Sequence, residues 1–261
     1  MIFMLAKNCG KKMFDAHFHY PECAASGCAD LAPGDVSGCS CAHSEHGWDI
    51  QKNFARLNPD LVLSFGVHPQ NPVRDSLEFL ESLLERGQAD AVGEAGFDLF
   101  TDEFRRNEAA QAEVWNVQLE LAEKYSKPLV VHCRRANFRL FADSARLSRL
   151  PSVVFHSFMG SPVEALSLRR RGVDAYFSFG KQLLNGNRNA AACVRTLPAG
   201  ALLFETDAPF QTLRGESATA MSEIERVYRA AWDLRGRSVE FGEFVSAAEG
   251  VFRSAFARPE G

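Results

Sequence analysis

The sequence has no long hydrophobic run, no large excess of one charge and no export signal of the usual form. Its longest apolar stretches, residues 61–67 and 129–131, fall far short of the roughly 20 residues that cross a bilayer as a helix. The apolar start, residues 1–6, is followed rather than preceded by lysines, which is the wrong order for a secretory signal. We therefore expect no membrane span and no secretion.

The charges nearly balance, with 29 lysines and arginines against 33 aspartates and glutamates, and the formal net charge is −4. A broad basic surface that grips long nucleic acid is therefore not expected. The seven cysteines are an odd number, which favours reduced thiols in a cytoplasmic protein over a disulfide framework. At 261 residues, the chain is long enough for one large α/β domain or for two of about 100–150 residues each.

Short runs of apolar, β-branched or aromatic residues alternate with longer amphipathic stretches of helical spacing. The sequence predicts eight strands, at residues 13–19, 35–42, 61–67, 91–94, 129–132, 153–156, 175–179 and 202–207. Helices are predicted at residues 45–57, 76–86, 104–125, 137–149, 162–171, 187–197, 220–234 and 239–256. The second strand is the weakest prediction, because its residues are small and polar.

Eight strand–helix units predict a parallel (β/α)8 TIM barrel with extra C-terminal helices, in the α/β class. An open doubly wound sheet is the alternative. The sequence shows no internal repeat, low-complexity tract or linker, so we expect one domain over residues 1–261. Residues 21–38, rich in Gly, Ala, Ser, Cys and Pro, are expected to form a loop.

The first predicted strand carries a polar face. Asp15, His17 and His19 alternate with apolar residues, and successive side chains of a strand point to opposite sides. We expect the apolar set to face the helices, which directs the two imidazoles and the carboxylate into the barrel mouth. Burying them there without partners costs several kcal/mol, and a metal ion removes that cost. A lone histidine would more often be a hydrogen-bonded core residue, but two at this spacing favour a metal.

Similar residues follow other predicted strands at their carboxyl ends. They are His68, Glu94, His132, His156 and Asp207. In a barrel all these strand ends lie at one rim. The candidate metal ligands are His17, His19, Glu94, His132, His156 and Asp207. Four imidazoles and two carboxylates are enough for two divalent ions.

Two ions about 3.5–4 Å apart need a bridging anion, and Glu94 is the candidate. We expect the first ion to be bound by His17, His19, Glu94 and Asp207, and the second by Glu94, His132 and His156. Four imidazoles favour zinc, manganese or iron-group ions, while carboxylates in an open rim also admit magnesium. Water bound to such ions is acidified toward neutrality, which supplies a hydroxide nucleophile.

Six short blocks occur along the chain, namely Asp15-Ala16-His17-Phe18-His19, Gly66-Val67-His68-Pro69, Gly93-Glu94-Ala95-Gly96-Phe97-Asp98, His132-Cys133-Arg134, His156-Ser157-Phe158 with Gly160, and Glu205-Thr206-Asp207-Ala208-Pro209. In this order they resemble the TatD-type metal-dependent hydrolases (deoxyribonucleases) of the amidohydrolase superfamily. The resemblance implies a TIM barrel, two divalent cations and, in many members, nuclease activity that releases nucleotides from DNA ends. It supports the ligand set position by position. The chain departs from the family pattern at Arg135, at residues 211–217, and around Cys39, Cys41 and His43.

For a phosphodiester substrate we expect two catalytic carboxylates, with Glu94 bridging the ions and Asp207 taking the proton of the nucleophile. Arg134 and His68 are expected to bind the phosphate, although an arginine at a barrel rim equally often forms a structural salt bridge. Three carboxylates are expected to lie behind the histidines and orient them, namely Asp15, Asp98 and Glu205. The expected partner is a phosphodiester or nucleic-acid end, and no obligatory protein partner is indicated.

Other functions stay open on the sequence alone. The same ions would also hydrolyse amide, ester or lactone bonds, and a non-catalytic metal-binding module would keep the histidines without turnover. A single-metal deaminase is less favoured, because Asp207 is followed by Ala208 instead of a second aspartate. A structural zinc site is a further hypothesis for Cys23, Cys28, Cys39, Cys41, His43 and His46, although their spacing matches no standard zinc module.

Overall fold

The strands alternate with helices and form one parallel sheet. The computed structural model describes residues 10–32 and 34–257. Within them the strands are β1 (Asp15–Phe18), β2 (Gly38–Ala42), β3 (Leu61–Phe65), β4 (Ala91–Asp98), β5 (Leu129–Arg134), β6 (Val153–Phe155), β7 (Ala175–Phe179) and β8 (Leu202–Phe204). Each strand pairs in parallel with the next one in sequence, as strands joined by crossover helices do.

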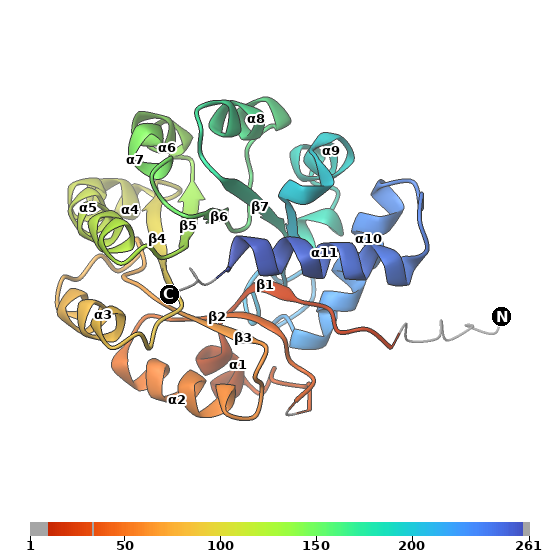
Figure 1. Cartoon of the computed structure of the whole chain (residues 1–261), viewed down its shortest axis with the longest axis horizontal. Coiled ribbons are helices and arrows are strands. Elements are labelled where there is room, and N and C mark those ends of the chain that lie inside the picture. The colour runs from red at the N-terminus through yellow and green to blue at the C-terminus, as the bar shows by residue number, and fades with distance from the viewer. Residues whose placement is uncertain (1–9, 33, 258–261) are drawn as a thin grey trace.

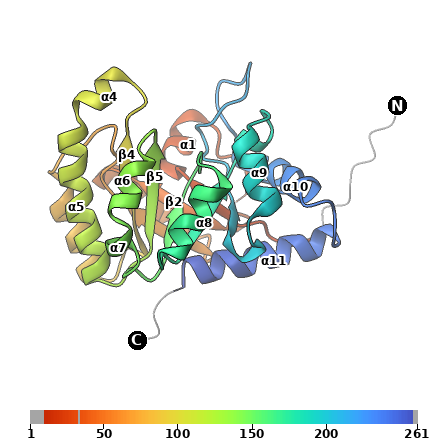
Figure 2. The same ribbon diagram turned by 90° about the horizontal axis from the view of Figure 1, so that it is seen from above.

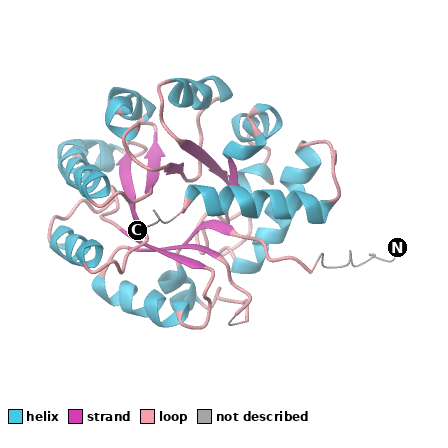
Figure 3. Cartoon of the chain, viewed as in Figure 1, coloured by secondary structure: helices cyan, strands magenta, loops and turns pink. Residues whose placement is uncertain are grey.

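Helices surround the strands in a ring (Figures 1 and 3). They are α1 (Tyr20–Ser26), α2 (Glu45–Ala55), α3 (Ser76–Glu85), α4 (Asp102–Arg106), α5 (Glu108–Lys124), α6 (Asn137–Ala142), α7 (Ser144–Leu147), α8 (Pro162–Arg170), α9 (Arg188–Thr196), α10 (Ile224–Leu234) and α11 (Phe241–Ala255). Short 3₁₀ helices are η1 (Lys181–Leu183), η2 (Ala199–Ala201) and η3 (Met221–Glu223). Among the described helices, none has the length and hydropathy of a membrane span.

The chain that follows the last strand returns to the first, so the barrel is nearly closed. The His19 N–H donates to the Ala208 carbonyl at 2.8 Å, and the Asp207 N–H donates to the His17 carbonyl at 2.9 Å. These two bonds join the carboxyl end of β1 to the segment that follows β8, so that the residues at 17–19 and 207 are held side by side. The predicted α/β TIM barrel with C-terminal helices is confirmed, and the alternative of an open doubly wound sheet is wrong.

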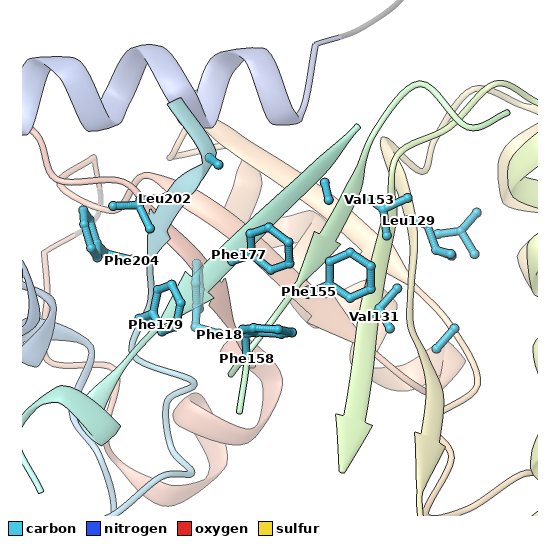
Figure 4. Packing of buried hydrophobic residues seen from close by; sticks show 14 of the residues in the cluster. Phe18, Leu129, Val131, Val153, Phe155, Phe158, Phe177, Phe179, Leu202 and Phe204 are labelled. Carbon is cyan, nitrogen blue, oxygen red and sulfur yellow. The ribbon is translucent and has the colours of Figure 1, made fainter. Parts of the chain in front are cut away.

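A layer of apolar side chains lies between the strands and the surrounding helices. Figure 4 shows some of them, among them Phe155 and Phe177, packed against one another along the strands. Phe155 of β6 and Phe177 of β7 stack with their ring centroids 5.5 Å apart, and Phe158 packs 4.7 Å from Phe177. All three rings are buried. Burying side chains of this size contributes about 1.5–3 kcal/mol each, so this layer fixes the strands whose ends carry the polar residues.

A second apolar cluster fills the barrel interior. It takes Phe14, Ala16, Cys39, Cys41, Ala91, Val130, Val154, Tyr176 and Leu203 from the strands or their starts. Helix α11 adds Phe252 and Phe256 to it, and the rings of Phe14 and Phe252 lie 4.9 Å apart. Figure 2 shows α11 across one end of the barrel, with α4 at the opposite end. The interior is therefore a packed core, covered at one end by α11.

The strict alternation expected for the first strand is wrong. Asp15 pairs with Gly38 and Phe18 pairs with Ser40, so three steps along β1 (18 − 15) match two steps along β2 (40 − 38). Such a bulge changes which side the following residues face. As a result Phe14 and Ala16 join the interior cluster, and only Phe18 of the apolar set faces the helices.

Glycine at position 38 accommodates this bulge. Its φ is +143°, and an added Cβ would lie 2.0 Å from the Asp15 carbonyl oxygen. Any other residue would therefore push the first two strands apart at the level where Asp15 turns away from the interior.

Three other expectations about the chain need correction. The helix predicted over 104–125 is two helices, α4 and α5, which meet at Asn107. The helix predicted over 137–149 divides at Asp143, whose Oδ2 accepts a 2.7 Å hydrogen bond from Trp115 Nε1. The predicted loop 21–38 begins with α1, because proline fits the first turn of a helix and Gly27, at φ +73°, ends it. Pro and Gly were helix boundary signals here, rather than loop signals.

Candidate metal centre

The structure brings together the six residues that the sequence put forward as ligands, around the buried Glu94 carboxylate of β4. Glu94 Oε1 lies 2.6 Å from His132 Nδ1 and 2.6 Å from His156 Nε2. Glu94 Oε2 lies 3.2 Å from His17 Nε2 and 3.4 Å from His19 Nε2. The two oxygens of one carboxylate therefore face two separate pairs of imidazoles.

Asp207 completes the pair of histidines from β1. Its Oδ1 lies 3.6 Å from His17 Nε2 and 3.4 Å from His19 Nε2, and its Oδ2 accepts a 3.1 Å hydrogen bond from Gln211 Nε2. Asp207 follows β8, and its backbone φ of +55° lies in the left-handed region that aspartate tolerates better than most residues. The backbone bonds of Asp207 and Ala208 with the end of β1 hold this carboxylate opposite the two imidazoles.

Two of the three expected supporting carboxylates touch histidine rings. Asp98 Oδ2 lies 3.2 Å from His132 Nε2 and accepts a 2.8 Å bond from Gln70 Nε2. Glu205 Oε1 lies 3.7 Å from His156 Nδ1. A carboxylate hydrogen-bonded to the far nitrogen of an imidazole fixes the orientation of the ring. Asp98 is within hydrogen-bond distance of His132, whereas His156 Nδ1 makes no hydrogen bond within the described chain.

Asp15 is placed differently from the expectation. Its carboxylate accepts hydrogen bonds from the Thr206 N–H at 2.9 Å and Oγ1 at 2.6 Å, and from the backbone N–H of His17 at 3.2 Å. In residues 10–32 and 34–257 it contacts no imidazole ring, because the bulge turns Asp15 away from the side that His17 faces. Asp15 therefore ties the backbone of β1 to the chain that follows β8.

Burial and the surrounding imidazoles set the charge of the centre. Burial opposes ionisation of Glu94, but the neighbouring His156, His68 and His17 hold its pKa well below the usual range. Burial also opposes ionisation of Asp207, and the hydrogen bond with His19 is the main influence that lowers its pKa. Burial lowers the pKa of His17, and it lowers the pKa of His68 to about 4. Burial opposes protonation of His19, His132 and His156, but their carboxylate neighbours outweigh it and raise the pKa of all three. Cations bind ionised carboxylates and neutral imidazoles, so an ion must displace protons from these rings.

The donor atoms fit a cation better than they fit one another. His17 Nε2 lies 3.1 Å from His19 Nε2, and His132 Nδ1 lies 3.1 Å from His156 Nε2. Glu94 Oε2 is buried and makes no hydrogen bond within the described chain. Lone pairs that face one another in a buried place are costly, and a metal ion satisfies several of them at once. The residues present therefore fit divalent ions.

His43 is a residue of this centre that the sequence analysis placed elsewhere. Its Nε2 lies 3.7 Å from Glu94 Oε2. The signal was available, because His43 directly follows β2 just as other histidines follow their strands. The nearby cysteines diverted the interpretation toward a structural zinc site.

That structural zinc cluster does not assemble in the described residues. Cys39 and Cys41 point into the barrel interior, whereas Cys23 packs in the layer between strands and helices. His46 is exposed on α2. The groups of metal-capable side chains found among the described residues contain no cysteine, so the six side chains serve different parts of the fold.

A cavity of about 860 Å³ opens over the centre and is lined in part by His68, Arg134, Met159, Phe210 and Gln211. Both residues expected to bind phosphate therefore reach it. His68 Nε2 lies 3.3 Å from Glu94 Oε1, closer to the candidate ligands than the sequence suggested.

Arg134 is partly engaged within the protein. Its guanidinium lies 4.2 Å from the Phe100 ring centroid, and its Nη1 lies 3.8 Å from Asp98 Oδ2. The side chain is still 43% exposed. Arg135 also lies over Phe100, at 4.6 Å. Stacking holds the guanidinium at the cavity wall while leaving N–H groups for an anion.

The fold and the site together define a TIM-barrel protein with a histidine and carboxylate centre, suited to metal ions, at the carboxyl ends of its strands. The family model described as TatD related DNase matches residues 14–256. The chain therefore belongs to the TatD related DNase family, as the sequence blocks indicated.

Individual relatives agree with this assignment. An uncharacterized metal-dependent hydrolase of Mycoplasma pneumoniae is 30% identical over 188 residues, which cover 67% of this chain and 69% of the relative. The 3'-5' ssDNA/RNA exonuclease TatD of Edwardsiella piscicida is 35% identical over 168 residues, covering 60% and 62%. The solved structure of the Escherichia coli TatD homologue YjjV superposes with a TM-score of 0.81 at 25% identity, covering 95% of this chain and 99% of that one.

Proposed function

We propose that the protein is a divalent-metal-dependent hydrolase with a binuclear site, and that it cleaves phosphodiester bonds at nucleic-acid ends, most readily those of DNA. The observation that carries the proposal is the position of Glu94, whose two oxygens face two pairs of imidazoles. A carboxylate shared in this way is what a two-ion centre requires. Membership of a family described as DNases and the exonuclease name of one relative support the phosphodiester substrate.

The proposed ligands divide at Glu94. His17, His19, Glu94 and Asp207 would hold one ion, and Glu94, His132 and His156 the other. The mixture of imidazoles and carboxylates suits zinc, manganese or magnesium. When bound, the ions neutralise charge on the phosphoryl oxygens and make a water more acidic.

The residues of the chain would then position the reactants and move the proton. The lowered pKa of Asp207 favours its ionised form, and Gln211 Nε2 donates to its Oδ2 at 3.1 Å; this oxygen would accept the proton of the attacking water. Arg134 and His68 line the cavity and would donate hydrogen bonds to the phosphate oxygens. Asp98 and Glu205, behind His132 and His156, would keep those rings oriented.

Hydrolysis of a labelled single-stranded oligonucleotide, with and without a chelator, tests this function. We expect stepwise shortening that stops on chelation and returns with added metal. His132→Ala should lower the occupancy of the second ion site, to which its ring is assigned. Hydrolysis should fall with it, because the reaction is proposed to need both ions. Cleavage that continues at full rate in the chelator would contradict the proposal, as would turnover of an amide, ester or lactone panel without any turnover of the oligonucleotide.

Two further properties belong to this proposal. We propose that the barrel and its closing helices act as one domain over residues 1–261, because α11 plugs the barrel interior through Phe252 and Phe256. We also propose a cytoplasmic location, because the six cysteines in the described residues are free thiols, which suits a reducing compartment. Cell fractionation would test the location.

A further inference from the structure

Histidines gather around Glu94 in greater number than the proposed ligand set uses. The seven histidines of the chain include six that lie within ion-pair distance of this carboxylate, namely His17, His19, His43, His68, His132 and His156. The seventh, His46, is exposed on α2. The one whose placement the proposed reaction does not use is His43.

The ring of His43 is fixed by the backbone of the neighbouring strand end. Its Nδ1 lies 2.9 Å from the Gly66 carbonyl oxygen. A carbonyl only accepts, so Nδ1 must carry the proton and donate it. The neutral ring then has its lone pair on Nε2. Histidines that bind metals show this arrangement, with the far nitrogen donating to a carbonyl or carboxylate.

The lone pair of His43 has no partner in the protein. Nε2 is buried and makes no hydrogen bond within the described chain, and it lies 3.7 Å from Glu94 Oε2. Glu94 Oε2 is itself without a hydrogen bond there. Two buried acceptors that face each other repel, and a cation between them turns the repulsion into attraction.

The ligand atoms of His19, His43 and Glu94 all lie within 4.8 Å of one another. The ring centroids of His43 and His19 are 5.4 Å apart. His43 therefore approaches the same oxygen of Glu94 that His17 and His19 face, on the side opposite His132 and His156.

We propose that His43 is a further metal ligand, through Nε2, for the ion held by His17 and His19. This inference rests on the proposed metal centre and adds a determinant of metal preference to it. Another imidazole makes that position better suited to zinc and similar ions than to magnesium, which prefers oxygen ligands and keeps its waters.

The test compares metal binding by the full-length wild-type protein with that of two variants. His43→Gln keeps a side chain of similar length, and His43→Ala removes the ring. His46→Ala is the matched control, because it removes an exposed histidine three residues away. Each metal-free protein is titrated with zinc against a competing chelator, then with magnesium, and its cobalt(II) absorption spectrum is recorded.

We expect zinc affinity at one of two sites to fall at least tenfold, on the order seen when a supporting partner of a ligand is lost. Magnesium affinity should change much less, and the cobalt spectrum should change in both His43 variants but not in His46→Ala. Wild-type zinc affinity and an unchanged cobalt spectrum in His43→Gln would overturn the inference and leave the proposed function intact. A wild-type protein that binds neither zinc nor cobalt would overturn both.

Discussion

Replacing Glu94 with glutamine is the most informative single change. Glutamine keeps the shape of the side chain and removes its charge. In the structure Oε1 contacts His132 and His156 at 2.6 Å, while Oε2 lies 3.2 Å from His17 and 3.4 Å from His19. If both ions share Glu94, this one substitution must lower the affinity for both of them. A change at any single imidazole should lower the affinity mainly for one ion.

The size of the effect depends on how many ions lose a ligand. Removing a partner that only orients a metal ligand already costs about 10–100-fold in affinity, or roughly 1.4–2.8 kcal/mol. Glu94 is proposed to touch both ions directly, so we expect at least that loss of affinity for each of them. Hydrolysis requires both ions, and the lower limit of the loss is about tenfold for each. The rate should therefore fall by at least the product of these two limits, about 100-fold.

The assay measures bound metal per chain by equilibrium dialysis and hydrolysis of the oligonucleotide in parallel. Glu103→Gln serves as the control, because Glu103 is exposed on α4 and the charge change is the same. We expect two tight sites in the control and none in Glu94→Gln at the same metal concentration. A variant that loses one site and keeps the other at wild-type affinity would refute the idea that Glu94 is shared.

Three further predictions follow from particular interactions. Asp98→Asn removes the carboxylate behind His132 and should weaken one ion about 10–100-fold; equal affinities by dialysis would argue against a supporting role. Burial lowers the pKa of His68 to about 4, from 6.5, so the unfolded chain binds more protons at this residue in that range, and His68 alone should cost the metal-free protein up to about 3 kcal/mol as the pH falls through it. Urea unfolding should show a smaller loss for His68→Gln, and an identical pH dependence would contradict this. Phe252→Ala should lower the free energy of unfolding by about 3–5 kcal/mol without changing bound metal, and a stability equal to wild type would contradict the interior packing.

The barrel could be predicted because its strands are short, buried and regularly spaced. β7 has the predicted bounds, 175–179, since Ala175, Tyr176, Phe177 and Phe179 make an apolar and aromatic run that ends at Gly180. The weak second strand was also correct, although β2 begins only at Gly38. β4 runs on to Asp98, four residues beyond the prediction, because its pairing with β5 continues past the apolar residues. Partners across the sheet set such limits, and one strand alone does not carry that information.

The sequence also allowed the prediction that the site residues come together, because the order of parallel strands decides where their ends lie. Parallel strands bring their carboxyl ends to one rim, so His132 and His156 could be placed together from sequence positions alone. The bulge in β1 could not be foreseen, because it depends on the approach of Asp15 to Gly38. The pattern of alternating residues in one strand does not reveal where its neighbour displaces it.

The most direct test of the central claim is anomalous diffraction from crystals of the wild-type protein loaded with zinc. The account predicts two ions, one on each side of Glu94, with ligand atoms about 2.0–2.2 Å away. One ion should be bound through Oε2 with His17 and His19, and the other through Oε1 with His132 and His156. A single ion, or ions bound away from Glu94, would contradict the account.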